Sequence, residues 1–232
     1  MIETLGVLKR VLDLAVRDAA IAVNPCSLRS ARLPKRPVTD RPVLSPGEVQ
    51  ALARAMPHGS DRVLVKVLAH VGLRIGEALA LRWTDVDLDR KTLTVRQSVE
   101  DTSGKVIVGP TKTYATRTVT LPNALVADLG DGLERSSFLV FPNRLGGYRR
   151  YRNWRRDHWD KACEASGVKA LPHDLRATCA LLLIDSGASP KDVQQHLGHE
   201  DVNTTLRLYA RVRPGRSVDL ATRLDALIVE AG

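Results

Sequence analysis

The sequence predicts a mainly α protein of the α+β class, in which helices surround a small three-stranded antiparallel β-sheet. Apolar residues recur at helical spacing over most of the chain, whereas residues 91–121 hold three short segments with the period-two alternation of strands. With 232 residues, 44% of them hydrophobic, the chain can bury a full core. We expect one large domain with an N-terminal appendage.

The appendage, residues 1–23, predicts one amphipathic helix. Its apolar residues follow helical spacing from Leu5 to Val23 and stop at Asn24-Pro25. Residues 24–44 then mix prolines with basic side chains, which predicts an extended basic linker. Since a domain needs about 50 residues or more, we expect residues 1–23 to be the last helix of a larger, truncated domain.

The main domain is expected over residues 45–214 and opens with helices. The stretch Ser45-Pro46-Gly47-Glu48 combines a capping serine, a first-turn proline and the glutamate of a capping box. A second helix is expected over Asp61–His70. Gly72 and Gly76 then bracket a break, after which a short helix restarts and presents Arg74 from its beginning.

Three strands are expected next, over residues 91–99, 105–108 and 117–121. Lys112 lies at the turn between the second and third strands, where its long side chain can reach a substrate. The pattern then returns to helix. His173 and Arg176 open one of these helices and share a face, and a later capped helix ends in a glycine turn before His199.

The charge balance predicts a polyanionic partner, because 35 Lys and Arg stand against 26 Asp and Glu, with a pI of about 9.8. Two basic runs favour contacts to the DNA backbone, which are electrostatic and carry little sequence information. The expected DNA-binding residues are Arg29, Arg32, Lys35, Arg36, Arg149, Arg150, Arg152, Arg155 and Arg156.

Other features exclude several classes of protein. The three cysteines have no C-x-x-C spacing, which argues against a disulfide framework or a zinc knuckle and fits a reducing cytoplasm. No apolar stretch approaches the roughly 20 residues of a membrane span. We expect neither a metal nor a cofactor, because no carboxylate or cysteine was found at ligand spacing from the remaining histidines, His58, His70, His158 and His196.

Six scattered residues form the most informative set. A phenol can attack phosphorus, while two guanidiniums, an ammonium and two imidazoles can neutralise and protonate a phosphodiester without a metal ion. This combination predicts DNA strand-transfer chemistry. The six residues are Arg74, Lys112, His173, Arg176, His199 and Tyr209.

Five motifs that hold these residues resemble, in order and spacing, the catalytic domain of tyrosine recombinases, the phage integrase family. They are Gly72-Leu73-Arg74-Ile75-Gly76-Glu77, Thr111-Lys112-Thr113, His173-Asp174-Leu175-Arg176-Ala177-Thr178, Leu197-Gly198-His199 and Thr204-Thr205-Leu206-Arg207-Leu208-Tyr209. The resemblance covers about residues 40–215, and the N-terminal helix resembles the last helix of the family's core-binding domain.

The resemblance implies a role for each residue. Tyr209 is implied as the nucleophile that forms a 3′-phosphotyrosyl bond and releases a 5′-hydroxyl. Arg74 and Arg176 would hold the non-bridging oxygens, and Lys112 would protonate the departing 5′-oxygen. The implied proton relay is His173 and the implied phosphate donor is His199. Glu77, one turn after Arg74, is expected to orient an arginine.

The same resemblance implies partners and location: double-stranded DNA recombination sites, a homotetramer on paired sites, accessory DNA-bending or directionality factors, and the bacterial host cytoplasm or nucleoid. Residues 215–232 carry an apolar helical stripe after Pro214-Gly215, and we expect them to dock on a neighbouring protomer. Three alternatives remain: a catalytically silent DNA-binding regulator, a type IB topoisomerase-like nicking-closing enzyme, and a metal-dependent phosphodiesterase that uses His173 and His199.

Overall fold

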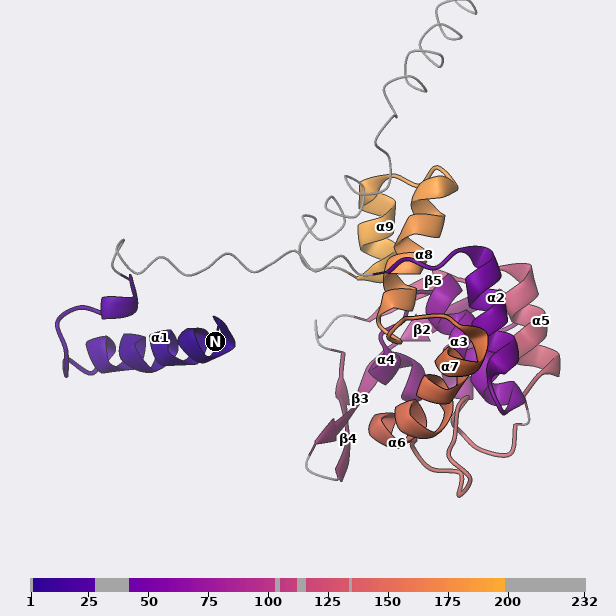
Figure 1. Ribbon diagram of the computed structural model, residues 1–232, viewed down its shortest axis with the longest axis horizontal. Coiled ribbons are helices and arrows are strands. Elements are labelled where there is room, and N and C mark those ends of the chain that lie inside the picture. The colour runs from indigo at the N-terminus through magenta and orange to yellow at the C-terminus, as the bar shows by residue number, and fades with distance from the viewer. Residues whose placement is uncertain (1, 28–41, 103–104, 112–115, 134, 199–232) are drawn as a thin grey trace, which may run out of the picture. The chain divides into compact units, whose positions relative to one another are not determined.

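The computed structural model describes residues 2–27, 42–102, 105–111, 116–133 and 135–198 (Figure 1). The chain divides into two compact units, Met1–Asp40 and Arg41–Gly232. The division falls inside the segment for which the sequence predicts a linker, residues 24–44. No helix in the described part of the chain is long and apolar enough to cross a membrane.

The first unit contains helix α1 (Ile2–Arg17) and the 3-10 helix Pro25–Ser27. The predicted helix ends at Arg17 instead of Val23, because Ala19 takes a left-handed backbone conformation with φ of 56°. After Ala19 the chain folds back, so that Asn24 contacts α1. The Asn24 amide donates hydrogen bonds to the Asp13 carboxylate (2.6 Å) and to the Lys9 carbonyl (3.0 Å).

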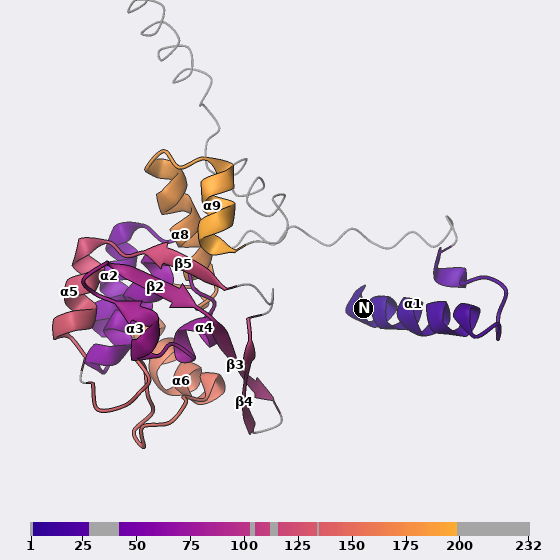
Figure 2. The same ribbon diagram turned by 180° about the vertical axis from the view of Figure 1, so that it is seen from behind.

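The second unit is mostly helical (Figures 1 and 2). Its helices are α2 (Pro46–Ala55), α3 (Gly59–His70), α4 (Ile75–Leu79), α5 (Asn123–Asp131), α6 (Tyr151–Trp154), α7 (Asp160–Ser166), α8 (Asp174–Asp185) and α9 (Pro190–Leu197). A 3-10 helix, Trp83–Asp85, follows α4, and a π-helical segment, Arg155–Trp159, joins α6 to α7. The predicted capping box of α2 is confirmed, and α9 begins with the same device at Ser189.

The strands form two antiparallel sheets, one with three strands and one with two. Strands β1 (Val86–Asp87), β2 (Thr92–Val95) and β5 (Arg117–Thr120) pair in the order β1-β2-β5. Strands β3 (Gln97–Thr102) and β4 (Lys105–Pro110) form a separate hairpin that extends away from the three-stranded sheet (Figures 1 and 2).

A mainly α fold with a small three-stranded antiparallel sheet is therefore confirmed, but its strands are not the three that were expected. The predicted strand 91–99 is interrupted at Arg96. Its first half joins β5, with Val95 opposite Arg117, while its second half pairs with β4. The alternation of side chains is similar on both sides of Arg96, so the sequence pattern does not reveal where the chain changes partner.

Helix α3 lies at the centre of the main core, where Leu64 and Leu68 are fully buried between α2, α5 and α8. A second, smaller cluster joins α8 to α9. Gly72 lies where these parts meet: its φ is +69°, and a Cβ at this position would overlap Leu197 and Cys179. The missing side chain allows the chain between α3 and α4 to lie against α8 and α9.

We therefore expect Gly72→Ala to lower the free energy of unfolding by about 2–5 kcal/mol, because a left-handed backbone costs about 1–2 kcal/mol and overpacking about 1–3 kcal/mol. The matched control is Gly109→Ala in β4, where an added Cβ meets no atom within 4 Å. The control should change stability by no more than about 0.5 kcal/mol. Urea denaturation of both variants provides the measurement, and equal effects would contradict the packing argument.

Candidate active site

Arg74 and Glu77 form the first part of the site, at the start of α4. Arg74 is the N-terminal capping residue of this helix, as the glycine break predicts. The Glu77 carboxylate accepts hydrogen bonds from the Arg74 backbone N–H (2.9 Å) and from Arg74 Nη1 (2.8 Å). The Glu77 side chain is 1% exposed and that of Arg74 is 25% exposed, so the arginine lies partly open to solvent beside a buried carboxylate.

Arg117, which none of the five motifs contains, binds the same carboxylate. Its Nη2 donates to Glu77 Oε2 (2.6 Å) and its Nη1 to Glu77 Oε1 (3.2 Å), a two-pronged ion pair. The sequence nevertheless contains a sign that Arg117 has a buried partner. Arg117 and the buried Val119 share one face of β5, and an arginine on the core side of a strand needs a buried partner.

The charge of Glu77 depends on these two arginines. Burial by itself raises the pKa of a carboxyl group. The hydrogen bonds and positive charges of Arg117 and Arg74 outweigh this effect, and the pKa of Glu77 lies below its ordinary value. The site therefore holds an ionised carboxylate at neutral pH.

Arg176, in the first turn of α8, adds a third guanidinium. Its Nη1 donates to the carbonyl of Gly72, 104 positions earlier in the chain, and its Nη2 donates to the carbonyl of Leu197 at the end of α9. Burial, and then the positive charge of Arg74, lower the pKa of Arg176 to about 9, so the guanidinium is still charged at neutral pH. Three guanidiniums and one carboxylate leave the cluster with a net charge of +2.

His173 is the residue before α8, and the structure places it one turn from Arg176. Its backbone carbonyl accepts from the Arg176 N–H (3.2 Å), and its side chain is exposed. The predicted helix start is therefore confirmed. The remaining candidates, Lys112, His199 and Tyr209, lie outside the described residues.

The segment that leads to His199 ends beside the arginine cluster. Gly198 ends α9 in a left-handed conformation with φ of +67°, as the predicted glycine turn requires. A Cβ on Gly198 would lie 3.1 Å from Cδ of Arg117. Gly198, the residue before His199, therefore lies close to the Arg117 side chain.

The second basic run, from Arg149 to Arg156, begins just before α6 and continues into the π-helical segment, and its arginines differ in their surroundings. Arg149 turns inward, where it pairs with the buried Asp61 and donates to Ser60 and to the Pro142 carbonyl. Arg155 pairs with Asp160 (3.3 Å). Arg149 therefore contributes to the packing of the protein itself.

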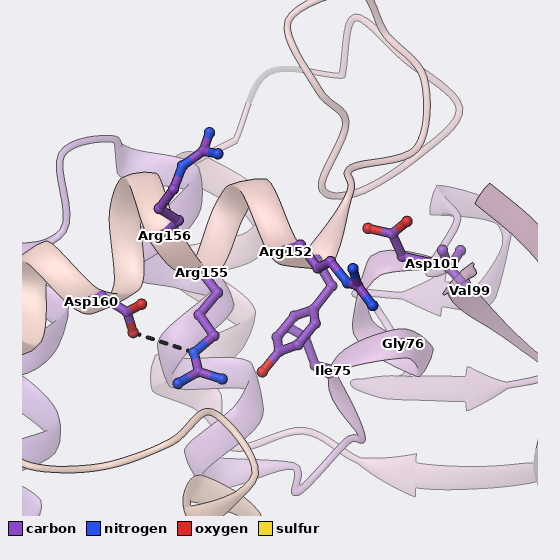
Figure 3. A pocket seen from close by; sticks show the side chains of 9 residues that line it. Ile75, Gly76, Val99, Asp101, Arg152, Arg155, Arg156 and Asp160 are labelled. Carbon is purple, nitrogen blue, oxygen red and sulfur yellow. Dashed lines mark hydrogen bonds and ion pairs between the residues drawn. The ribbon is translucent and has the colours of Figure 1, made fainter. Parts of the chain in front are cut away.

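Other arginines of this run line a groove beside α4 (Figure 3). Arg152, Arg155 and Arg156 line it from α6 and the π-helical segment, opposite Ile75 and Gly76, which follow Arg74 in the chain. Arg152 and Arg156 are exposed, and Arg156 pairs with the neighbouring Asp157 (2.7 Å). The first basic run, with Arg29, Arg32, Lys35 and Arg36, lies outside the described residues.

Among the described residues, one cluster has the chemistry of a metal site: His58, Asp61 and His158. Sequence spacing did not suggest it, because Asp61 reaches across 97 positions to accept from Nδ1 of His158 (2.7 Å). Asp61 also accepts from Arg149 and from Trp154 Nε1 (2.9 Å). A cation bound to Asp61 would face the Arg149 guanidinium, so we interpret Asp61 as the buried acceptor that joins α3 to the basic run.

Comparison with known proteins relates both the sequence and the fold to integrases. The chain is 27% identical to a tyrosine recombinase XerC-like protein of Caldanaerobacter subterraneus subsp. tengcongensis, covering 96% of this chain and 64% of the relative. It is 30% identical to the integrase of Mycobacterium phage D29, covering 96% of this chain and 61% of the relative. The chain therefore spans about three fifths of the length of these curated relatives.

Solved structures show the same fold. The integrase of transposon Tn1549, in complex with a circular intermediate DNA, matches 96% of this chain and 78% of its own with a TM-score of 0.79 and 18% identity. A lambda integrase dimer bound to a core site matches 88% of this chain and 57% of its own with a TM-score of 0.61 and 20% identity. Residues 42–216 match the Phage integrase family, and the chain belongs to that family.

Proposed function

We propose that this chain is the catalytic part of a site-specific DNA recombinase or integrase that cleaves and rejoins DNA through a 3′-phosphotyrosyl intermediate. One observation carries the proposal: Arg74 and Arg176, from motifs far apart in the sequence, meet in a cluster with a net charge of +2. Such a cluster suits a phosphodiester, whose negative charge increases as the pentacoordinate state forms.

In the proposed reaction, Arg74 and Arg176 bind the non-bridging oxygens of the phosphate. The phenol of Tyr209 attacks phosphorus, a 3′-phosphotyrosyl bond forms, and the bond to the 5′-oxygen breaks. An unperturbed tyrosine has a pKa of about 10, so its proton must be removed as the new bond forms. We assign this transfer to His173, which is exposed one turn from Arg176.

Two further groups complete the proposed chemistry. Lys112 protonates the departing 5′-oxygen, and His199 donates a hydrogen bond to the phosphate. The closeness of Gly198 to Arg117, where an added Cβ would lie 3.1 Å from Cδ, supports this role for His199. Rejoining reverses these steps, with a 5′-hydroxyl attacking the phosphotyrosyl bond and returning the proton to Tyr209.

The proposed DNA partner is a double-stranded recombination site. Arg150, Arg152, Arg155 and Arg156 supply the backbone contacts of the second basic run, and the first run adds Arg29, Arg32, Lys35 and Arg36. Arg149 is left out, because its guanidinium binds Asp61. The two integrase structures named above are complexes with DNA, which supports this partner.

The alternatives have less support. A silent regulator is expected to lack at least one catalytic residue, whereas all six are present in the sequence. The metal-like cluster in the described part of the chain, His58, Asp61 and His158, does not include His173, which the phosphodiesterase alternative requires. Motif order and spacing favour a recombinase over a type IB topoisomerase.

We further propose that the active form is a homotetramer on two paired duplexes, assisted by accessory DNA-bending or directionality factors. The apolar stripe of residues 218–229, at Leu220, Leu224, Leu227 and Ile228, would dock on the next protomer in a cyclic exchange. This exchange would keep cleavage low until both sites are occupied.

Covalent capture tests the reaction. The chain is incubated with a pool of nicked duplexes of random sequence, and adducts that survive denaturant are isolated and sequenced. The wild type should form an adduct, and Tyr209→Phe should abolish it while leaving DNA affinity nearly unchanged, because only the nucleophile is lost. Tyr151→Phe is the matched control and should retain the adduct. A Tyr209→Phe adduct that maps to another tyrosine would contradict the assignment.

Metal removal tests the charge argument. Because the arginines, lysine and histidines supply the positive charge that a divalent ion would bring, adduct formation should continue in excess EDTA at about the same rate. Loss of the adduct on chelation, restored by zinc or magnesium, would favour the phosphodiesterase alternative.

Deletion of residues 217–232 tests assembly. The shortened chain should remain soluble and bind DNA weakly, but recombination between two copies of the captured duplex should be lost, because the docking segment is absent. Gel electrophoresis of the products measures recombination, and light scattering measures solubility. Normal recombination, or aggregation from an opened core, would contradict docking on a neighbour.

A further inference from the structure

We infer that Arg117 is a positioning residue, which neutralises the buried Glu77 and so leaves the charges of Arg74 and Arg176 available to a phosphate. The inference deepens the proposed function and rests on it, since the phosphate is that of the DNA substrate. No sequence motif pointed to Arg117, and its place in the site comes from the structure alone.

The side-chain hydrogen bonds to Glu77 divide unequally between the two arginines. Arg117 uses both terminal nitrogens, one on each carboxylate oxygen, at 2.6 and 3.2 Å. Arg74 gives the carboxylate one side-chain hydrogen bond, at 2.8 Å. The Arg117 side chain is also the more buried, at 10% exposed against 25% for Arg74. Arg117 is therefore the principal counter-charge, and Arg74 is the arginine that is more open to a ligand.

The net charge of the cluster shows what Arg117 adds. Arg74 and Arg176 together carry two positive charges, and Glu77 removes one of them unless Arg117 supplies a third. Without Arg117, Arg74 would be the only one of these two arginines left to balance the Glu77 carboxylate, which would then compete with an incoming phosphate for it. With Arg117 present, Glu77 can hold the backbone and side chain of Arg74 in place at no cost in net charge.

Arg117 also contacts the turn that leads to His199. The missing side chain of Gly198 makes room for the Arg117 stem, because a Cβ there would lie 3.1 Å from Cδ and 3.4 Å from Nε. Arg117 begins β5, five positions after Lys112 in the sequence. One side chain thus joins the strand that follows Lys112, the start of α4 and the end of α9.

The charge argument is tested by restoring neutrality without the arginine. Arg117→Gln leaves Glu77 with only Arg74 as an ion-pair partner, whereas the double variant Arg117→Gln with Glu77→Gln removes both charges and returns the cluster to +2. The probe is orthovanadate, an inorganic anion that adopts the pentacoordinate geometry of the transition state. Calorimetry measures its affinity for the full chain, and thermal denaturation of each variant monitors folding.

Arg117→Gln should weaken vanadate binding by about tenfold to a hundredfold, because the cluster loses one positive charge close to the anion. The vanadate affinity of the double variant should return to within about threefold of that of the wild type. This recovery would not occur if Arg117 were needed only for folding or for direct contact with the phosphate. Failure of the double variant to recover affinity would overturn the inference. Glu77→Gln alone provides a second test: it should weaken vanadate binding less than Arg117→Gln does, because the amide oxygen can still accept from Arg74 while the net charge of the cluster rises, and an equal or larger loss would also overturn the inference.

Covalent capture separates this inference from the proposed function. With the captured duplex, Arg117→Gln should lower the maximal rate of adduct formation, and the double variant should recover part of it, while the duplex concentration at half-maximal rate changes little. If the wild type forms the adduct but the double variant does not recover vanadate affinity, the inference is wrong and the proposed function stands. If the double variant recovers vanadate affinity but the wild type captures no duplex, the anion site stands and the recombinase proposal fails.

Discussion

The site depends on a single buried carboxylate. Three guanidiniums gathered in one place repel each other, and burial makes each charge more costly. Glu77 offsets this repulsion by accepting from Arg74 and Arg117, and its own pKa is lowered as a result. The carboxylate lowers the repulsion within the cluster, and the excess of arginines over carboxylates keeps the net charge positive.

Backbone carbonyls complete this arrangement. Arg176 is 4% exposed, and its guanidinium donates to the carbonyls of Gly72 and Leu197, which come from two different turns. The same side chain therefore carries charge for the site and holds the α3–α4 connection against the end of α9. Gly72 makes this approach possible, since any larger residue would meet Leu197 and Cys179. Arg176 and Gly72 therefore contribute both to the stability of the fold and to the geometry of the site.

The arginines of the second basic run show that composition alone does not assign a role. Arg149 and Arg152 are three positions apart, yet Arg149 is bound to the buried Asp61 while Arg152 is exposed on a groove beside α4. Asp61 needs this partner because an unpaired buried carboxylate is costly. Part of the positive charge of the chain thus stabilises the fold, while another part, such as that of Arg152, is exposed.

Neighbouring residues predict the local features of the chain: the capped starts of α2 and α9, the glycine break that makes Arg74 the N-terminal capping residue of α4, and the start of α8 after His173. Caps and turns are local, so their residues predict them directly. Tertiary structure alone decided the division of the sheets at Arg96, the pairing of Arg117 with Glu77 across 40 positions, and that of His158 with Asp61 across 97. These contacts join segments whose separation in sequence carries no periodic signal, and they form only when the core brings the segments together.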